Sequence, residues 1–264
     1  MFSKLFGLGG KNRSTHYPKA PVSRAARPRS FRPRLEELEV RCTPSVSIYL
    51  QGDGANWYLY ATCTGGPDTV TVDHSGSSTS INGVSFFDVD FNAIYITGAG
   101  GGLTTNIRAT VKPVHVEGHH DFDTVNVGNT SNRVQGIQAP LYLTNPPLYN
   151  IVNVNDQGDS VPRTATVSTV TIGGFLYEQI TGLGMGGSAE IDAKVADTRA
   201  VNLQTGYGGT TVSVLATAAF TYGGSTTIFG HGIDTVNVGS AGSVQNIGPS
   251  DDRERAQLYH HQHQ

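Results

Sequence analysis

The hexapeptide DTVNVG occupies residues 123–128 and recurs unchanged at residues 234–239, 111 positions later. In both copies β-branched apolar residues alternate with polar ones, and the segment lies between an Asp and a Gly. Alternation with a period of two, bounded by turn-forming residues, is typical of a short β-strand. We therefore expect one strand to occur twice in this chain.

Other motifs recur around the hexapeptide at nearly the same spacing. VQGI at residues 134–137 returns as VQNI at 244–247, and the Ala-Thr pair at 109–110 returns at 216–217. Several matches in one order, with a small drift that loop insertions would produce, indicate a duplication. The sequence predicts two units of about 110 residues.

Short apolar-polar-apolar segments occur throughout the same region. They lie at residues 70–72, 114–116, 125–127, 152–154, 201–203 and 236–238. The segment 189–201 contains Ala, Lys and Arg, which favour a helix, but its apolar and charged residues alternate in turn. We expect strand there as well, because this periodicity belongs to a strand.

Composition supports an all-β chain. The 264 residues include 33 Gly and only 15% charged residues, whereas helical bundles are rich in Ala, Glu, Lys and Leu. Two cysteines are too few for a disulfide scaffold, and no apolar run reaches the ~18 residues of a membrane-spanning helix.

We expect a right-handed parallel β-helix, or β-solenoid, over residues 46–248, with a β-sandwich as the alternative. In a solenoid, valines of successive turns meet inside, while Asn, Thr and Ser rows bond along the outside. This arrangement predicts like environments for the two DTVNVG copies. A sandwich would require hairpins at regular intervals.

Charge divides the chain. Residues 1–41 hold ten basic and three acidic residues, whereas the remainder holds eight basic and eighteen acidic ones. We expect residues 1–45 to be a disordered basic arm and residues 249–264 an irregular polar tail. The acidic body disfavours a nucleic-acid partner.

Residues 34–45, RLEELEVRCTPS, resemble the RLxLExLEDRxxPS motif found near the N-termini of exported planctomycete proteins. Val40 departs from the Asp that is usual in this motif. The resemblance implies export to the cell surface or the extracellular space. The targeting residues that it assigns are Arg34, Leu35, Leu38, Arg41, Pro44 and Ser45.

The body resembles repeats in large exported planctomycete proteins of unassigned function. Besides DTVNVG and VQGI, the matching segments are 151–159 (IVNVNDQGD), 163–167 (RTATV) and 180–183 (ITGL). The resemblance implies a repeat-bearing surface protein and supplies no catalytic residues. We expect a non-catalytic structural or adhesive protein of the envelope or matrix, whose partners are extracellular polysaccharide or other envelope proteins.

Two other functions stay open. A carbohydrate-active enzyme, a lyase or hydrolase, would use carboxylates such as Asp88 with Asp90, or Asp121 with Asp123, each pair expected on one strand face. A calcium β-roll is the second, because residues 230–236 fit most of its nonapeptide and make Asp123 and Asp234 candidate ligands. We favour Asp as a turn cap and assign no cofactor.

Histidines and aromatic residues give weaker hypotheses. His115, His119 and His120 could hold a transition metal, although exposed turn positions explain them better. The group of Trp57, Tyr58 and Tyr60 is expected to cap the core or, as an alternative, to stack on carbohydrate. Cys63 is expected to pack in or beside a strand.

Overall fold

The computed structural model describes residues 46–119 and 121–248, which lie in one compact unit. The described residues are all-β, as the sequence predicts: they form strands and two short 3-10 segments but no α-helix. None of their helices is long or apolar enough to cross a membrane. The predicted arm, its targeting motif and the polar tail lie outside the described residues.

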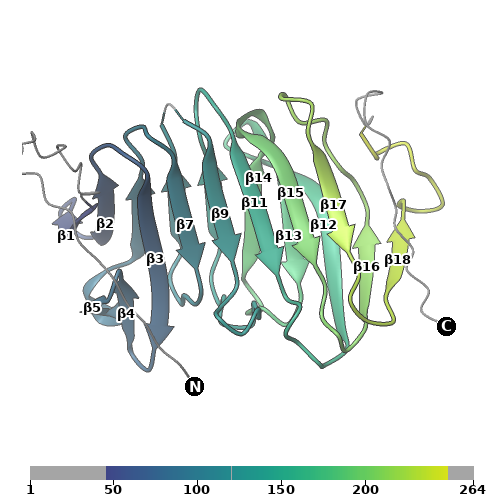
Figure 1. Ribbon diagram of the computed structural model, residues 1–264, viewed down its shortest axis with the longest axis horizontal. Helices are drawn as coiled ribbons and strands as arrows, with labels where there is room; N and C mark the ends of the chain where they lie inside the picture. The colour runs from purple at the N-terminus through teal and green to yellow at the C-terminus, as the bar shows by residue number, and fades with distance from the viewer. Residues whose placement is uncertain (1–45, 120, 249–264) are drawn as a thin grey trace, which may run out of the picture. The chain divides into compact units, whose positions relative to one another are not determined.

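The strands form two large mixed sheets (Figure 1). The ten-stranded sheet has the order β1 (Val46–Gly52), β2 (Trp57–Cys63), β6 (Ala93–Thr97), β8 (Val114–Glu117), β10 (Leu141–Thr144), β14 (Glu190–Lys194), β13 (Phe175–Gly182), β12 (Arg163–Ile172), β16 (Thr210–Val214) and β18 (Thr235–Val238). The eight-stranded sheet has the order β17 (Ser225–Phe229), β15 (Thr198–Gln204), β11 (Asn150–Asn155), β9 (Asp123–Val127), β7 (Leu103–Ile107), β3 (Asp68–Ser75), β4 (Ser78–Ile81) and β5 (Val84–Phe87).

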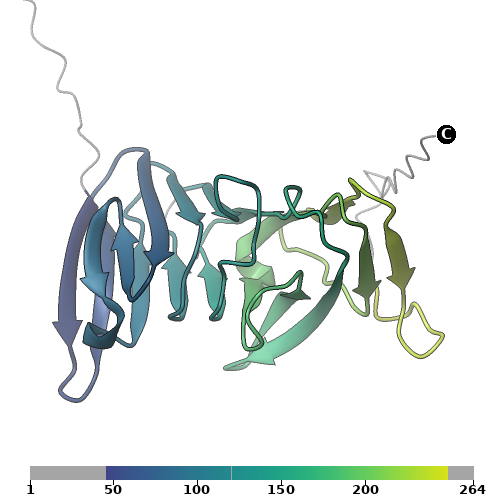
Figure 2. The ribbon, with the colours of Figure 1, turned by 90° about the horizontal axis from the view of Figure 1, so that it is seen from below.

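From β6 to β11 the chain alternates between the two sheets, and each strand lies parallel to the one placed two positions earlier. The registers set Val125 opposite Val152 and Asn126 opposite Asn153. Every second side chain of these strands is buried in one shared core between the sheets, which Figure 2 shows as opposed layers. The period-two alternation in the sequence is thus the division between core and surface.

Antiparallel strands interrupt this pattern at three places. β1 pairs with β2 at one edge of the ten-stranded sheet, and β4 and β5 extend the eight-stranded sheet beside β3. β12, β13 and β14 form a third antiparallel group, so β13 and β12 separate β14 from β16. In the other sheet β11 pairs directly with β15. The ten-stranded sheet is therefore wider at this point.

The segment 189–201 is β-structure, as predicted, but it is not one strand. β14 ends at Lys194, a 3-10 turn (η2, Val195–Asp197) follows, and β15 begins in the other sheet. Ile191, Ala193 and Val195 all pack in the hydrophobic core, although Val195 already belongs to the turn. The alternation predicts the strand and does not reveal the change of sheet.

The two DTVNVG copies both form strands, but the prediction of like environments is wrong. β9 lies inside the eight-stranded sheet between β7 and β11, whereas β18 lies at the edge of the ten-stranded sheet beside β16. Val127 is 1% exposed and its counterpart Val238 is 46% exposed. The added strands and the alternation between sheets bring the second copy to the opposite layer.

Candidate functional site

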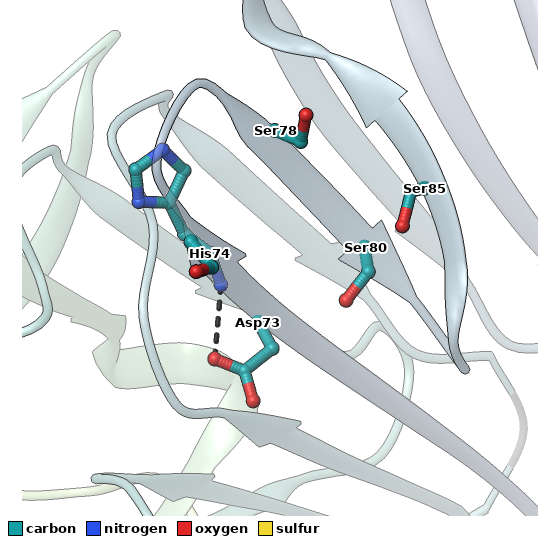
Figure 3. Close-up of a pocket in the computed structure, with 6 residues that line it drawn as sticks. Asp73, His74, Ser78, Ser80 and Ser85 are labelled. Carbon is teal, nitrogen blue, oxygen red and sulfur yellow. Dashed lines mark hydrogen bonds between the residues drawn. The ribbon is translucent and has the colours of Figure 1, made fainter.

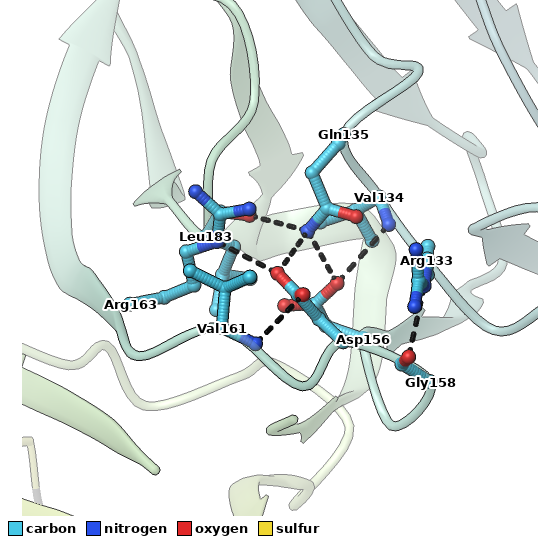
Figure 4. Close-up of polar contacts among 9 residues, drawn as sticks. Arg133, Val134, Gln135, Asp156, Gly158, Val161, Arg163 and Leu183 are labelled. Carbon is cyan, nitrogen blue, oxygen red and sulfur yellow. Dashed lines mark hydrogen bonds and ion pairs between the residues drawn. The ribbon is translucent and has the colours of Figure 1, made fainter. Parts of the chain in front are cut away.

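Four of the motifs quoted above meet at one polar cluster, which we call the Asp156 network: Gln135, Asp156, Asp159, Arg163 and the carbonyl of Leu183. The amide nitrogen of Gln135 lies 2.7 Å from Asp156 Oδ1, 3.0 Å from Asp159 Oδ2 and 2.8 Å from the Leu183 oxygen (Figure 4). Arg163 Nε donates to Asp159 Oδ2 at 2.7 Å. Residues from VQGI, NVNDQGD, RTATV and ITGL thus contact one another directly.

The two carboxyls of the network differ in proton affinity. Burial raises the pKa of Asp156 to about 6, against the hydrogen bonds from Gln135 and from the backbone of Val134. Its Oδ2 is buried without a hydrogen-bond partner. Burial acts in the same direction on Asp159, but the bonded Arg163, the Val161 N–H and the charge of Arg133 together outweigh it and hold that pKa below its ordinary value.

This network joins the end of β11 to the start of β12. In the ten-stranded sheet β12 lies two places from β14, with β13 between them. Gly158 is required there because a Cβ at this position would lie 1.8 Å from the carbonyl oxygen of Ser131. The Gly158 N–H instead donates to Asn132 O at 2.8 Å. Asp156 is 0% exposed and Asp159 2% exposed, so the carboxyls bind their own chain and offer solvent no surface.

A second cluster, which we call the β14 cluster, lies on the outer side of the ten-stranded sheet: Gln179, Glu190, Asp192, Lys194 and Asp197. Glu190, Asp192 and Lys194 alternate with the core residues of β14, and Gln179 lies opposite Asp192 on β13. The Gln179 amide lies 3.0 Å from both Glu190 Oε2 and Asp192 Oδ1. Sequence reasoning did not anticipate this meeting of acidic and basic groups, because β13 and β14 pair only in the folded chain.

The electrostatics of the β14 cluster favour the protonated form of Asp192. Burial, together with the neighbouring Glu190, raises the pKa of Asp192 to about 7, against the Gln179 hydrogen bond. Lys194 Nζ lies 3.0 Å from Asp197 Oδ2, which also accepts from the Asn145 N–H at 3.3 Å. Asp192 is 0% exposed. Asp192 therefore holds a proton more tightly than an ordinary Asp does, but it offers solvent no surface.

Beside this cluster runs a row of stacked rings, the aromatic row: Tyr49, Tyr60, Tyr95, His115 and Tyr142. Successive ring centroids are 5.4, 5.3, 4.5 and 4.8 Å apart, with nearly parallel planes. Such stacking stabilises neighbouring strands. Since each face of Tyr60 lies against another ring, Tyr60 does not offer a free face for carbohydrate. Tyr142 is in register with Asp192, where the row ends.

The outer side of the eight-stranded sheet carries the asparagine row: Asn106, Asn126, Asn153 and Asn202. The amide nitrogens of Asn126, Asn153 and Asn202 each donate to the side-chain oxygen of the preceding member, at 3.0, 2.9 and 2.9 Å. The expected hydrogen-bonded row of asparagines is thus present across β7, β9, β11 and β15. Its amides are satisfied by one another.

A shallow pocket of about 310 Å³ lies over β3, β4 and β5 and is lined by Asp73, His74, Ser75, Ser78, Ser80 and Ser85 (Figure 3). The ring atom Nε2 of His74 lies 2.9 Å from Asp88 Oδ2. Asp88 also accepts from Thr79, which lies opposite His74 in the register. Consecutive strand residues point to opposite faces, so His74 faces away from the serines that share the Asp73 face. The Ser, His and Asp side chains form no catalytic triad.

In neither of the carboxylate pairs that the sequence suggested do the two residues share a strand face. Asp88 and Asp90 lie in a 3-10 turn (η1, Asp88–Asp90), because the chain leaves β5 at Phe87. Asp121 precedes β9, and its carboxylate accepts the Gly101 N–H. Asp123 begins β9 and is buried. The carboxylates of Asp88, Asp121 and Asp123 thus bind the local backbone or a neighbouring side chain.

The calcium candidates Asp123 and Asp234 occupy equivalent capping positions. Asp123 Oδ1 accepts the Leu103 N–H at 2.7 Å, and Asp234 Oδ1 accepts the Thr210 N–H at 2.6 Å. Asp234 Oδ2 also accepts from Thr205 Oγ1 and the Gly232 N–H. Burial raises the pKa of Asp123 to about 6. In the described part of the chain no three His, Cys, Asp or Glu side chains come close enough to hold a metal.

The remaining candidates lie apart from these clusters. His115 belongs to the aromatic row, where burial lowers its pKa, and His119 lies 3.5 Å from Glu117; His120 is outside the described residues. Cys63 is buried at the end of β2, as expected, and burial raises its pKa to about 12. Comparisons with protein-family models, curated proteins and solved structures found no match.

Glu178 is a further buried carboxyl that sequence reasoning missed. It lies opposite core-facing Ala193 and accepts from Thr226 Oγ1, while burial raises its pKa to about 7. The sequence LYEQI around it gives no sign that Glu, rather than its neighbours, points inward. Only the antiparallel register of β13 settles its orientation.

Proposed function

We propose that the chain is a non-catalytic structural protein, exported to the cell surface or extracellular matrix, whose two sheets are faces of a right-handed parallel β-helix. Parallel strands that alternate between two sheets favour this winding over a β-sandwich, and parallel crossovers are nearly always right-handed. Export rests on the motif at residues 34–45 and on the resemblance of the body to exported repeats.

The asparagine row is the observation that carries the structural role. Its amides bond to one another across four strands, at 3.0, 2.9 and 2.9 Å. The Asp156 network and the aromatic row likewise use their polar and aromatic groups to hold strands together. Groups that satisfy one another inside the fold stabilise it and leave few of them for chemistry on a substrate.

A structural or adhesive role predicts stability without turnover. Purified full-length protein should leave uronic-acid and neutral polysaccharides intact, while retention on immobilised polysaccharide or envelope extract would identify an adhesive partner. For export, fusion of residues 1–45 to a reporter in a planctomycete should place the reporter outside the cytoplasm. Replacing Leu35 and Leu38 with Asp should retain it inside. A reporter that stays inside in both cases contradicts export.

A carbohydrate-active enzyme is the second candidate, because the β14 cluster brings three acids, Glu190, Asp192 and Asp197, together with Lys194. This function requires a substrate to reach Asp192, which is 0% exposed. Release of unsaturated or reducing oligosaccharides that depends on Asp192, and is lost in Asp192→Asn, would replace the structural role with this one.

A further inference from the structure

The C-terminal edge of the ten-stranded sheet reproduces a surface that is covered elsewhere in the molecule. We call residues 103–137 the first copy and residues 210–247 the second copy. β18 pairs in parallel with β16 as β9 pairs with β7. The first copy has a further parallel neighbour, β11, on the other side of β9, whereas β18 has none among the described strands.

The loops that follow the two strands also match. Gly128 N–H donates to Ile107 O at 3.0 Å, and Gly239 N–H donates to Val214 O at 2.8 Å. Isolated bridges join Thr110 to Ile137 and Thr217 to Ile247. The second copy therefore presents both the strand and the loop in the arrangement of the first.

In the first copy the chain segment 150–159 covers this surface. β11 runs along β9, and the residues after it bind the loop: Asp156 Oδ1 accepts the Val134 N–H at 3.2 Å and the Gln135 amide at 2.7 Å. Gly158 N–H donates to Asn132 O at 2.8 Å. The cover is thus an alternating strand followed by Asp and Gly.

In the second copy the same positions are open. Val134 is 0% exposed, but its counterpart Val244 is 62% exposed; Gln245 and Asn237 are exposed too. β18 holds no charged residue and no Pro, which are the usual protections of an edge strand. The segment 249–264 has no alternating apolar pattern with which to cover it.

We propose that β18 and the loop at residues 240–247 bind, in parallel, an extended strand of another polypeptide with the pattern of residues 152–158, V-N-V-N-D-x-G. The apolar side chains of this strand cover Val236, and its Asn continues from Asn237. Its Asp accepts the Val244 N–H and the Gln245 amide, and its Gly permits the close approach to the loop. Addition of a strand to an open edge is a general mode of peptide recognition. The inference rests on the structural role proposed above and names a partner for it.

The test uses the full-length protein and a fluorescent peptide with the sequence of residues 150–160. Fluorescence anisotropy should show saturable binding. The same peptide with Asp156→Ala should bind at least about tenfold more weakly, because two hydrogen bonds to a carboxylate are lost. Val238→Lys in the protein should abolish binding. The matched control, Val84→Lys on the edge strand β5, should leave binding unchanged.

No binding at millimolar peptide, or equal binding of the Asp156→Ala peptide, overturns the proposal. Loss of binding in Val84→Lys places the peptide at the other end and overturns it too. Binding that appears only after deletion of residues 249–264 assigns the edge to the chain's own tail, again against the proposal. None of these outcomes bears on turnover of polysaccharide, which is what would overturn the structural role itself.

Discussion

One hexapeptide, in β9 and in β18, makes the same local contacts in two different settings. In both copies the leading Asp accepts a backbone N–H from the preceding parallel strand, and the closing Gly donates to the end of that strand. Val125 is 0% exposed because β9 has a second neighbouring strand, β11, whereas Val236 on the edge strand is only partly buried. The local sequence thus specifies strand and caps, and neighbouring strands decide how much each residue contributes to stability.

A charge introduced into the strands should give the largest difference in stability between the two copies. Val127→Asp places an unpaired carboxylate in the core and should abolish folding or cost more than about 4 kcal/mol. Val238→Asp, at 46% exposure, should cost less than about 1 kcal/mol. Urea denaturation followed by circular dichroism compares them. Equal losses would show that β18 is as fully covered as β9.

Substitutions at the loops that follow β9 and β18 should give the next largest difference in stability. Asp156→Ala removes the acceptor of the Val134 N–H and of the Gln135 amide, and should cost about 2–3 kcal/mol. Gln245→Ala, at the open counterpart of Gln135, should change stability by less than about 0.5 kcal/mol. Thermal melts of both variants measure the contrast. An Asp156→Ala variant as stable as the parent would show that the Asp156 network does not stabilise the fold.

Lower pH should increase the folding stability of the protein. The pKa values of Asp123 and Asp156 are raised to about 6, so the folded chain binds protons that the unfolded chain, with an Asp pKa of about 3.9, has lost. Stability is therefore full below about pH 4 and falls as pH rises through about 6. Glu178 and Asp192, with pKa values of about 7, act in the same direction.

The melting temperature should accordingly be several degrees higher at pH 5 than at pH 8. Asp156→Asn should reduce this difference, because an amide has no proton to lose in this range. Calorimetry across pH 4–8 in buffers of equal ionic strength measures it. A melting temperature that rises with pH would contradict the assignment of buried, protonated carboxyls.

The smallest contrast concerns the asparagines. Asn126→Ala removes two side-chain hydrogen bonds of the asparagine row and should cost about 1–2 kcal/mol. Asn237→Ala, on the exposed edge, should be within about 0.5 kcal/mol of the parent. Chemical denaturation of the two variants is sufficient. Equal effects would mean that the row contributes little.

The sequence predicts individual strands well. All six apolar-polar-apolar segments lie in strands, and the asparagine row follows from Asn at the centre of neighbouring segments. These features depend on local alternation, which a chain shows whichever sheet it joins. The two copies of DTVNVG lie in different sheets because of the strands that the chain forms between them. The local alternation within each copy does not reveal which sheet it joins.

The clusters of polar side chains are harder to predict for the same reason. VQGI and NVNDQGD are visible as motifs, but the contact between Gln135 and Asp156, 21 residues apart, depends on the parallel pairing of β9 with β11. The β14 cluster depends on the antiparallel pairing of β13 with β14. Asp88 and Asp90 do not share a strand face because β5 ends at Phe87 and both residues lie in the 3-10 turn that follows it.

Hydrogen exchange at single residues tests the comparison most directly. A parallel strand bonded on one side only has every second amide free, whereas one bonded on both sides has none. Exchange followed by NMR should therefore show slow amides throughout β9 and alternating slow and fast amides along Thr235–Val238. Uniform protection along both strands would contradict an open edge at β18, and with it the difference between the two copies.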